Sequence, residues 1–352
     1  TTTSLVATLL CVAGFDPTLA IGGRVDSLGG NAKLGTGKYV VAEADESDGS
    51  FLHLPTVYSV VTNIDNDHLD FYGTMEAIDE AFINFVGKIP FYGVAIVCGE
   101  DAGVRRCLTR LTKPFLTYGF SSFWDIYADD IKKSGLGSSY NAYFRDGPGK
   151  PHVLLGRFEL SVPGRHNVLN SLAAVAVSLK IGISVEKITE GLRQFVGVKR
   201  RFEVRWQNSI RNCAVVDDYG HHPTEIAATL DAARDHWSGR IVTVFQPHRF
   251  SRTLHCHDGF LSAFKKSDVL IMTDIYSAGE DPIEGVNSKS LVNDIRGTVY
   301  APKEMIYIGD LAHAKDEVIK RFKDGDMVLC LGAGSITKLA DQIAKGLQKE
   351  VP

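Results

Sequence analysis

Acidic side chains gather directly after two apolar segments near the start of the chain. Residues 43–48 (EADESD) follow YVVA, and residues 62–70 (TNIDNDHLD) follow YSVV. We expect neighbouring parallel strands here, and open α/β sheets bind ligands at the carboxyl ends of their strands. Carboxylate oxygens suit Mg²⁺ bound with a nucleotide phosphate. The first motif therefore indicates a metal–phosphate site rather than a solvated acidic loop, whereas the second fits such a site or a polar turn equally well.

A third polar motif opens an apolar helical segment. Residues 163–170 (PGRHNVLN) precede SLAAVAVSL, so His166 or Asn167 could cap the predicted helix. Asn170 lies one turn further on, where a cap has no use for it. A carboxamide carries a donor and an acceptor side by side, which suits the edge of a base such as adenine.

The segment DDYGHHPTE, which follows the predicted strand AVVD, carries two adjacent histidines. His221 and His222 are neighbours on a turn and cannot easily chelate one ion together. A loop that contacts substrate is therefore the better interpretation, with Thr224 as a candidate cap for the next helix.

A basic motif, QPHRFSR, follows the predicted strand IVTVF. Arg249 and Arg252 are three residues apart and share a face if the segment is helical. Paired guanidinium groups suit a carboxylate or a phosphate, and the alternative is an exposed basic turn. His255-Cys256-His257 matches no usual zinc spacing, and the turn at residues 332–334 (GAG) is only a weak anion-binding signal.

The elements that position these motifs alternate between strands and helices. Apolar β-branched runs, typical of strands covered on both faces, occur at residues 39–43, 58–63, 94–98, 214–217, 241–245, 269–272 and 327–331. Helical periodicity occurs at residues 74–86, 167–180, 185–195, 224–233, 288–295, 312–322 and 336–347. This alternation predicts an α/β protein with parallel, doubly wound sheets.

Residues 124–161 alternate in polarity between Gly and Pro positions, which predicts a small extra antiparallel sheet beside the first α/β unit. The length of 352 residues suits about two domains. Residues 197–203 (GVKRRFE) separate a helix from a new run of strands, so we predict domains at 1–200 and 201–352.

Composition excludes several classes of protein. The chain has 42 acidic and 38 basic residues and is 44% hydrophobic, which argues for a globular core and against a polybasic nucleic-acid or membrane-surface protein. Apolar runs fall short of the roughly 20 residues that span a bilayer. Residues 5–14 (LVATLLCVAG) lack the basic segment of a signal peptide, so we expect a buried helix in a chain that starts mid-domain. The six widely spaced cysteines are expected to be reduced core residues.

Seven motifs in order resemble the Mur ligases of bacterial peptidoglycan synthesis: TTTS, EADESD, TNIDNDHLDFYG, PGRHNVLN, VDDYGHHPTE, QPHRFSRT and LGAGSITK. The family has three domains, and the resemblance implies that this chain corresponds to the last two. Residues 1–200 would form the central ATP-binding domain, a mostly parallel sheet with a small antiparallel one. Residues 201–352 would form a Rossmann-like ligase domain. The family's phosphate loop reads GTHGKTTT, and the sequence opens within its threonines.

The resemblance also implies roles for individual residues. Glu43 and His68 would ligate Mg²⁺. ATP would be contacted by Thr1, by His166 and Asn170 at the adenine, by Arg201 at the phosphates and by Asp218 at the ribose. The pocket for the amino acid and the sugar's lactyl carboxylate would be lined by Tyr219, His221, His248, Arg249 and Arg252. Some members carry a carbamylated lysine at the metal, and the sequence places none there.

The implied activity is ATP-dependent ligation of L-alanine to the lactyl carboxylate of UDP-N-acetylmuramate in the bacterial cytoplasm, through an acyl phosphate. One alternative is the sister ligase that reattaches recycled tripeptide, for which a DDFAHHP-like loop would be expected in place of DDYGHHP. Another is a non-catalytic nucleotide-binding module. Without the phosphate-loop lysine and the sugar-binding domain, residues 1–352 alone are expected not to ligate. No nucleic-acid or membrane partner is expected, and the sequence does not predict an oligomeric state.

Overall fold

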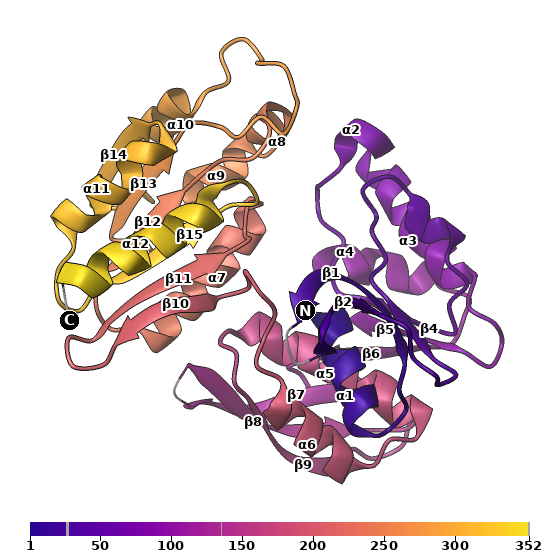
Figure 1. The fold of residues 1–352 in the computed structure, drawn as a ribbon. Helices are drawn as coiled ribbons and strands as arrows, with labels where there is room; N and C mark the ends of the chain where they lie inside the picture. The colour runs from indigo at the N-terminus through magenta and orange to yellow at the C-terminus, as the bar shows by residue number, and fades with distance from the viewer. Residues whose placement is uncertain (26–27, 135, 351–352) are drawn as a thin grey trace. The chain divides into compact units, whose positions relative to one another are not determined.

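The computed structural model describes residues 1–25, 28–134 and 136–350. Its internal contacts divide the chain into two compact units, Thr1–Val198 and Lys199–Pro352, each built from strands and helices (Figure 1). The division falls inside the GVKRRFE segment. Each unit is described by itself below.

The main sheet of the first unit has six strands in the order β4-β5-β6-β7-β8-β9. These are β4 (Tyr58–Val61), β5 (Val94–Cys98), β6 (Phe115–Gly119), β7 (Ile126–Ser134), β8 (Gly137–Phe144) and β9 (Val153–Leu160). The first four strands run parallel, and β8 and β9 are antiparallel to their neighbours. The predicted antiparallel strands therefore exist. The expectation that they form a separate sheet is wrong, because Tyr118 pairs with Ile126 and β7 extends the parallel sheet.

A separate three-stranded sheet, ordered β2-β1-β3, lies near the start of the chain. It contains β1 (Thr18–Val25), β2 (Gly30–Lys33) and β3 (Val40–Ala42). β3 pairs in parallel with β1, so the strands preceding Glu43 and His68 belong to different sheets. The expectation that these two strands are neighbours is therefore wrong. The partner strand, TLAIGGRV, escaped prediction because its glycines weaken the strand signal.

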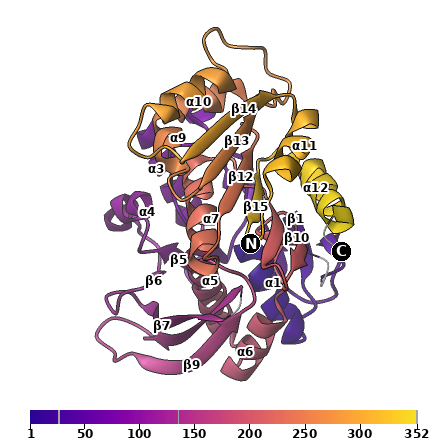
Figure 2. The ribbon, with the colours of Figure 1, turned by 90° about the vertical axis from the view of Figure 1, so that its left-hand side faces the viewer.

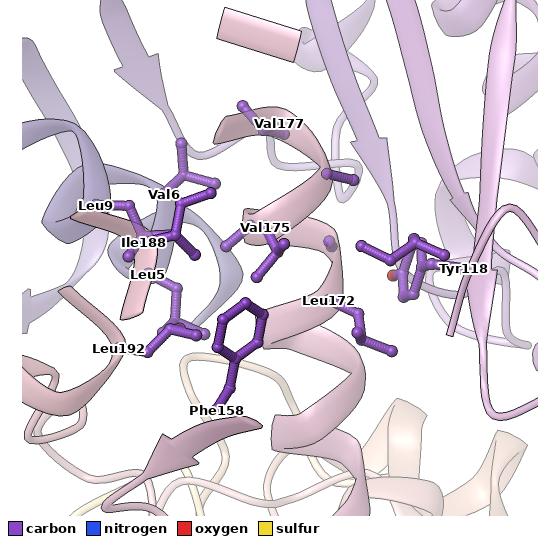
Figure 3. Packing of buried hydrophobic residues seen from close by; sticks show 14 of the residues in the cluster. Leu5, Val6, Leu9, Tyr118, Phe158, Leu172, Val175, Val177, Ile188 and Leu192 are labelled. Atoms are coloured by element: carbon purple, nitrogen blue, oxygen red, sulfur yellow. The ribbon is translucent and has the colours of Figure 1, made fainter. Parts of the chain in front are cut away.

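Helices cover both faces of the main sheet. α1 (Thr2–Val12), α5 (Arg165–Ile181) and α6 (Val185–Gln194) share one hydrophobic cluster with β5 to β9. Figure 3 shows Leu5 and Leu9 of α1 gathered with Leu172 and Val175 of α5 and with Ile188 of α6. The other face is covered by the 3₁₀ turn η2 (Ser50–His53), α3 (Met75–Gly87), α4 (Ala102–Cys107) and η3 (Leu108–Arg110), and the short α2 is Leu69–Tyr72. The buried N-terminal helix is confirmed.

The second unit is a doubly wound α/β sheet with the strand order β10-β11-β15-β12-β13-β14. Its strands are β10 (Glu203–Asn208), β11 (Cys213–Asp218), β12 (Ile241–Phe245), β13 (Val269–Thr273), β14 (Glu304–Gly309) and β15 (Met327–Leu331). Only β10 pairs antiparallel among these described strands. Every residue of β11, β12, β13 and β15 is buried, as expected for strands covered on both faces.

The helices of this unit separate into two layers (Figures 1 and 2). α7 (Pro223–His236), α9 (His257–Ala263) and α10 (Ser288–Arg296) pack on one face, and α11 (Leu311–Arg321) and α12 (Ile336–Glu350) pack on the other. The short α8 is Phe250–His255. All six cysteines are free thiols, as expected, and four of them are buried. Across the described ranges, no helix is long and apolar enough to cross a membrane.

The loop after β4, which carries His68, is held by the start of α4. Asp101 Oδ1 accepts hydrogen bonds from the backbone N–H of Ile64 at 3.1 Å and of Val104 at 2.8 Å. A Cβ added to Gly103 would lie 2.1 Å from the carbonyl oxygen of Ile64. Gly103 therefore allows the close approach of α4 that fixes this loop.

We predict that Gly103→Ala lowers the free energy of unfolding by about 1–3 kcal/mol, because the new methyl must displace the buried backbone at Ile64. Gly87→Ala is the matched control, since a Cβ there meets nothing within 4 Å. It should be neutral or stabilising by up to about 1 kcal/mol, because alanine favours the helix more than glycine does. Urea titration of both variants measures the difference, and equal stability of the two would contradict this account of the loop.

Candidate active site

Three of the residues expected at the nucleotide, Thr1, His166 and Asn170, lie at the starts of α1 and α5. Thr2 Oγ1 donates a 2.9 Å hydrogen bond to Asn170 Oδ1, and Asn170 Nδ2 donates to Asn167 Oδ1 at 3.2 Å. The Asn167 carboxamide in turn donates to the Pro163 carbonyl at 2.6 Å. Thr1 is the N-cap residue of α1 and so adjoins this network. Asn167, which the sequence offered only as a cap, is instead a buried link in the chain of amides.

The start of α5 also contains His166, which is half-buried. The N-cap residue of α5 is Gly164, so neither His166 nor Asn167 caps the helix. Beside His166, the Arg165 guanidinium lies 4.1 Å from the centroid of the Phe120 ring. The start of α5 therefore presents an amide pair, an imidazole and a guanidinium within two turns.

The predicted metal residues lie in two loops that contact each other. Glu43 is exposed at the end of β3, and its Oε2 accepts a 2.9 Å hydrogen bond from the Gly22 N–H. His68 Nε2 lies 3.6 Å from Glu46 Oε1, and the Tyr72 hydroxyl donates to the Glu46 carbonyl at 2.6 Å. The EADESD loop and the His68 loop are thus joined, although their strands belong to different sheets.

This arrangement offers few protein ligands. Among the residues that the structure describes, no group of three or more His, Cys, Asp or Glu side chains is placed to hold a metal ion. Mg²⁺ usually keeps several waters and takes one or two carboxylates together with substrate phosphates. Carboxylates from the EADESD loop therefore fit a Mg²⁺ ion that is completed by waters and nucleotide phosphates, and His68 as a direct ligand stays a prediction.

In the second unit, the loops after β11, β12 and β13 meet in a cluster of rings. The His221 and His248 ring centroids are 5.6 Å apart, and Tyr219 lies edge-on to His221 at 5.3 Å. Tyr276 stacks on His248 at 5.6 Å with an interplanar angle of 18°. Because parallel strands bring their carboxyl ends to one edge, His248 lies against both His221, 27 residues earlier, and Tyr276, 28 residues later.

Arg252 lies beside this ring cluster. Its Nη1 atom is 3.4 Å from His248 Nδ1. Burial, together with the neighbouring His221, Arg252 and Arg249, lowers the pKa of His248 to about 4. At neutral pH the cluster therefore presents an uncharged imidazole next to a guanidinium.

Arg249 faces a different partner. Its Nε atom lies 3.9 Å from Glu280 Oε1, and its backbone N–H donates to the Tyr276 carbonyl at 2.8 Å. Arg249 is the N-cap residue of α8, whereas Arg252 lies within that helix. The two arginines therefore do not form the pair predicted from their spacing. Arg249 faces the Glu280 carboxylate, and Arg252 faces the His248 imidazole.

The turn at residues 200–202 surrounds Tyr219 with positive charge. The Arg200 and Arg201 guanidinium groups lie 4.8 and 5.3 Å from the Tyr219 ring centroid. Arg201 Nη1 is also 3.3 Å from Glu225 Oε1. Arg200 Nη2 donates at 2.6 Å to the carbonyl of Gly332, in the turn after β15.

Asp218 holds this turn in place from inside the protein. Its carboxylate is 5% exposed and accepts hydrogen bonds from the N–H groups of Phe202 and Gly220, both at 2.8 Å, and from Thr229 Oγ1 at 3.2 Å. Burial raises the pKa of Asp218. Asp218 thereby fixes the backbone on either side of Tyr219, and its contact with a ribose stays a prediction.

The cap of α7 differs from the expectation. His222, not Thr224, is the N-cap residue, and its side chain accepts a hydrogen bond from the Thr224 N–H at 3.4 Å. Glu225 Oε2 accepts from the N–H groups of His221 and His222 at 3.1 and 3.2 Å. This capping box gives the two histidines different roles, because His222 caps α7 and His221 joins the ring cluster.

Sequence reasoning missed Arg200, Gln246, Tyr276 and Glu280. Gln246 Oε1 accepts a 3.2 Å hydrogen bond from Ile336 N–H at the start of α12. A Cβ on Gly334 would lie 2.7 Å from Gln246 Oε1 and 2.8 Å from Tyr276 Cγ, which explains that glycine. The signal for Tyr276 and Glu280 was present, because the segment DIYSAGEDP follows the predicted strand VLIM directly.

Comparison with known families accounts for both units. Residues 1–178 match the family described as Mur ligase middle domain, and residues 200–334 match Mur ligase, glutamate ligase domain. The chain belongs to the Mur ligase family.

Individual relatives show which members of the Mur ligase family this chain is similar to. A UDP-N-acetylmuramate–L-alanine ligase of Geotalea uraniireducens is 45% identical over 100% of this chain and 74% of its own length. One from Geobacter sp. (strain M21) is 47% identical over 97% of this chain and 72% of its length. Among solved structures, UDP-N-acetylmuramate–alanine ligase MurC of Thermotoga maritima superposes with a TM-score of 0.80 at 27% identity, covering 99% of this chain and 73% of that one. The MurF ligase of the same organism, solved with ADP, shares the fold with a TM-score of 0.77 at 19% identity, over 99% of this chain and 78% of that one.

The ring cluster makes a prediction about pH. His248 has a folded-state pKa below its ordinary value of 6.5, so the unfolded chain binds this proton more tightly. Its contribution to stability is therefore complete above pH 6.5 and is lost as the pH falls towards about 4. We expect an NMR titration midpoint near pH 4 for His248.

His257 provides the internal reference. Its hydrogen bond with Asp294 raises its pKa, so it should titrate above 6.5 in the same spectra. His248→Gln should flatten the loss of stability between pH 6.5 and about 4. A His248 midpoint at or above that of His257 would show that the ring cluster is not desolvated as described.

Proposed function

We propose that this protein is an ATP-dependent ligase that joins L-alanine to the lactyl carboxylate of UDP-N-acetylmuramate, releasing ADP and phosphate in the cytoplasm of a bacterium. The observation that carries the proposal is 45–47% identity, across 97–100% of the chain, to relatives named for this reaction. The product would be a precursor of peptidoglycan.

The reaction needs activation because a carboxylate is a poor electrophile. Phosphorylation by ATP makes its oxygen a good leaving group, so an acyl phosphate forms and the neutral amine of alanine attacks it. Mg²⁺ disperses charge on the phosphoryl group when it is bound. In the first unit, Asn170 and His166 would contact the adenine and Thr1 the phosphates. Glu43 and His68 would hold the metal, with Glu46 close to His68.

The second unit would bind the amino acid. Arg252 is proposed to donate hydrogen bonds to the alanine carboxylate, next to the uncharged His248. Tyr219 and His221 would line the same pocket. Arg201 would contact the nucleotide phosphates, and Asp218 would contact the ribose. Arg249 would support the pocket through its contact with Glu280.

The test measures ATP-dependent phosphate release by the full-length natural protein with UDP-N-acetylmuramate and a panel of amino acids. Product mass is read in parallel. We expect turnover with L-alanine to exceed turnover with the other amino acids. Turnover only with a tripeptide acceptor would identify a recycling ligase instead. ATP binding without any product would identify a nucleotide-binding module.

The metal assignment predicts that Glu43→Gln, which removes the charge and keeps the shape, lowers kcat roughly 100-fold. Excess Mg²⁺ should rescue it only in part. Glu46→Gln is the informative comparison, because Glu46 is the carboxylate beside His68. Glu76→Gln, at an exposed acid in α3, is the control. If Glu43→Gln turns over like wild type at limiting Mg²⁺ and Glu46→Gln loses most of its turnover, Glu46 rather than Glu43 is the metal ligand.

The carboxylate assignment predicts that Arg252→Lys raises the KM for alanine roughly 10- to 100-fold, since a charge-assisted contact is worth about 1.5–3 kcal/mol. An ammonium group cannot reproduce the planar guanidinium fork. Arg249→Lys should have a smaller effect, because Arg249 faces Glu280. Steady-state kinetics with each substrate varied separates the alternatives. If the KM for alanine stays constant in both variants while the KM for ATP rises, these arginines serve the nucleotide.

A further inference from the structure

α8, the short helix that carries Arg252, is not capped by its own N-cap residue. That residue is Arg249, with φ 70° and ψ 140°, and within the described chain its side chain makes no capping hydrogen bond. Instead, Glu280 accepts hydrogen bonds from the Ser251 N–H at 3.0 Å and from Ser251 Oγ at 2.6 Å. A carboxylate 29 residues further along the chain therefore performs the capping.

Tyr276 ties the preceding turn to the same loop. Its N–H donates to the Pro247 carbonyl at 2.8 Å, and its carbonyl accepts from the Arg249 N–H at 2.8 Å. The Tyr276 ring stacks on His248. On its other side, a Cβ added to Gly334 would lie 2.8 Å from Tyr276 Cγ, so the ring is packed against the turn after β15.

These contacts hold a strained conformation. A non-glycine residue with positive φ outside the common regions costs about 1–3 kcal/mol and persists only where its surroundings enforce it. Arg249 is such a residue, and the contacts that enforce its conformation come from Tyr276 and Glu280. The positions of His248 and Arg252, which flank Arg249, therefore depend on the loop after β13.

We propose that Glu280 and Tyr276 are positioning residues for the amino-acid pocket, holding the turn of residues 247–252 so that Arg252 and His248 face the substrate. This inference rests on the proposed function and deepens it. Glu280 acts on the alanine carboxylate through Arg252, and Tyr276 acts by fixing the His248 ring. The loop thus sets affinity for the amino acid rather than affinity for ATP.

The kinetic test is a double-mutant cycle on the full-length protein with Glu280→Gln and Arg252→Lys. Glu280→Gln should raise the KM for L-alanine roughly 10- to 100-fold and leave the KM for ATP unchanged, because a small displacement of a binding group is costly. The double variant should be little worse than Arg252→Lys alone, since coupled residues are non-additive. Additive effects would overturn the proposal. Glu284→Gln, at an exposed acid on the same loop, is the matched control and should match wild type.

Tyr276 is tested by rescue. Tyr276→Ala should raise the KM for L-alanine, whereas Tyr276→Phe keeps the ring on His248 and should restore it. Equal losses in both variants would assign the effect to the hydroxyl and refute positioning through the ring.

A readout without turnover separates this inference from the proposed function. The Ser251 amide proton should exchange slowly in wild type and at least tenfold faster in Glu280→Gln, while Glu284→Gln matches wild type. Slow Ser251 exchange in Glu280→Gln would overturn the inference even if alanine is the substrate. Fast exchange in Glu280→Gln, with no alanine-dependent turnover in wild type, would instead contradict the proposed function. The conclusion that Glu280 stabilises the turn of residues 247–252 would still hold.

Discussion

The site in the second unit depends on one constraint, which is that buried parallel strands end at a common edge. β11, β15, β12 and β13 are neighbours in the sheet and are wholly buried, so their register is fixed from both faces. The polar residues that follow these strands therefore lie close together at that edge. Tyr219 and His221 follow β11, His248 follows β12 and Tyr276 follows β13, and the four rings form one cluster.

Electrostatics then shapes that edge. Asp218 lies at the end of β11, where burial raises its pKa and its carboxylate accepts hydrogen bonds from the backbone N–H groups of Phe202 and Gly220. His248 is desolvated at the end of β12 and is held uncharged beside two arginines. The edge thus combines a buried acid that orders the backbone, a neutral imidazole and the Arg252 guanidinium beside it. Such a combination suits recognition of a carboxylate next to an amine that must itself become neutral before it reacts.

Much of this arrangement was predictable, because the strands of the second unit are long apolar runs and the motifs follow them directly. The strand ends marked the segments that carry His221 and His248, whereas the pocket role of these residues was implied by the family resemblance. The segment after VLIM, DIYSAGEDP, carries Tyr276 at the same kind of strand end. The first unit was harder. TLAIGGRV is a strand despite its glycines, since β3 pairs with it, and that pairing removes Glu43 from the main sheet. The capping role of Glu280 could not be predicted, because it depends on the backbone conformation of Arg249, 31 residues earlier.

The central claim is that the lactyl carboxylate is activated by phosphorylation before alanine attacks it. The direct measurement uses UDP-N-acetylmuramate labelled with ¹⁸O in that carboxylate, and mass spectrometry of the phosphate released by the full-length protein. The account predicts one ¹⁸O atom in each phosphate, together with an amide product that contains alanine. Unlabelled phosphate accompanying the same product would contradict it.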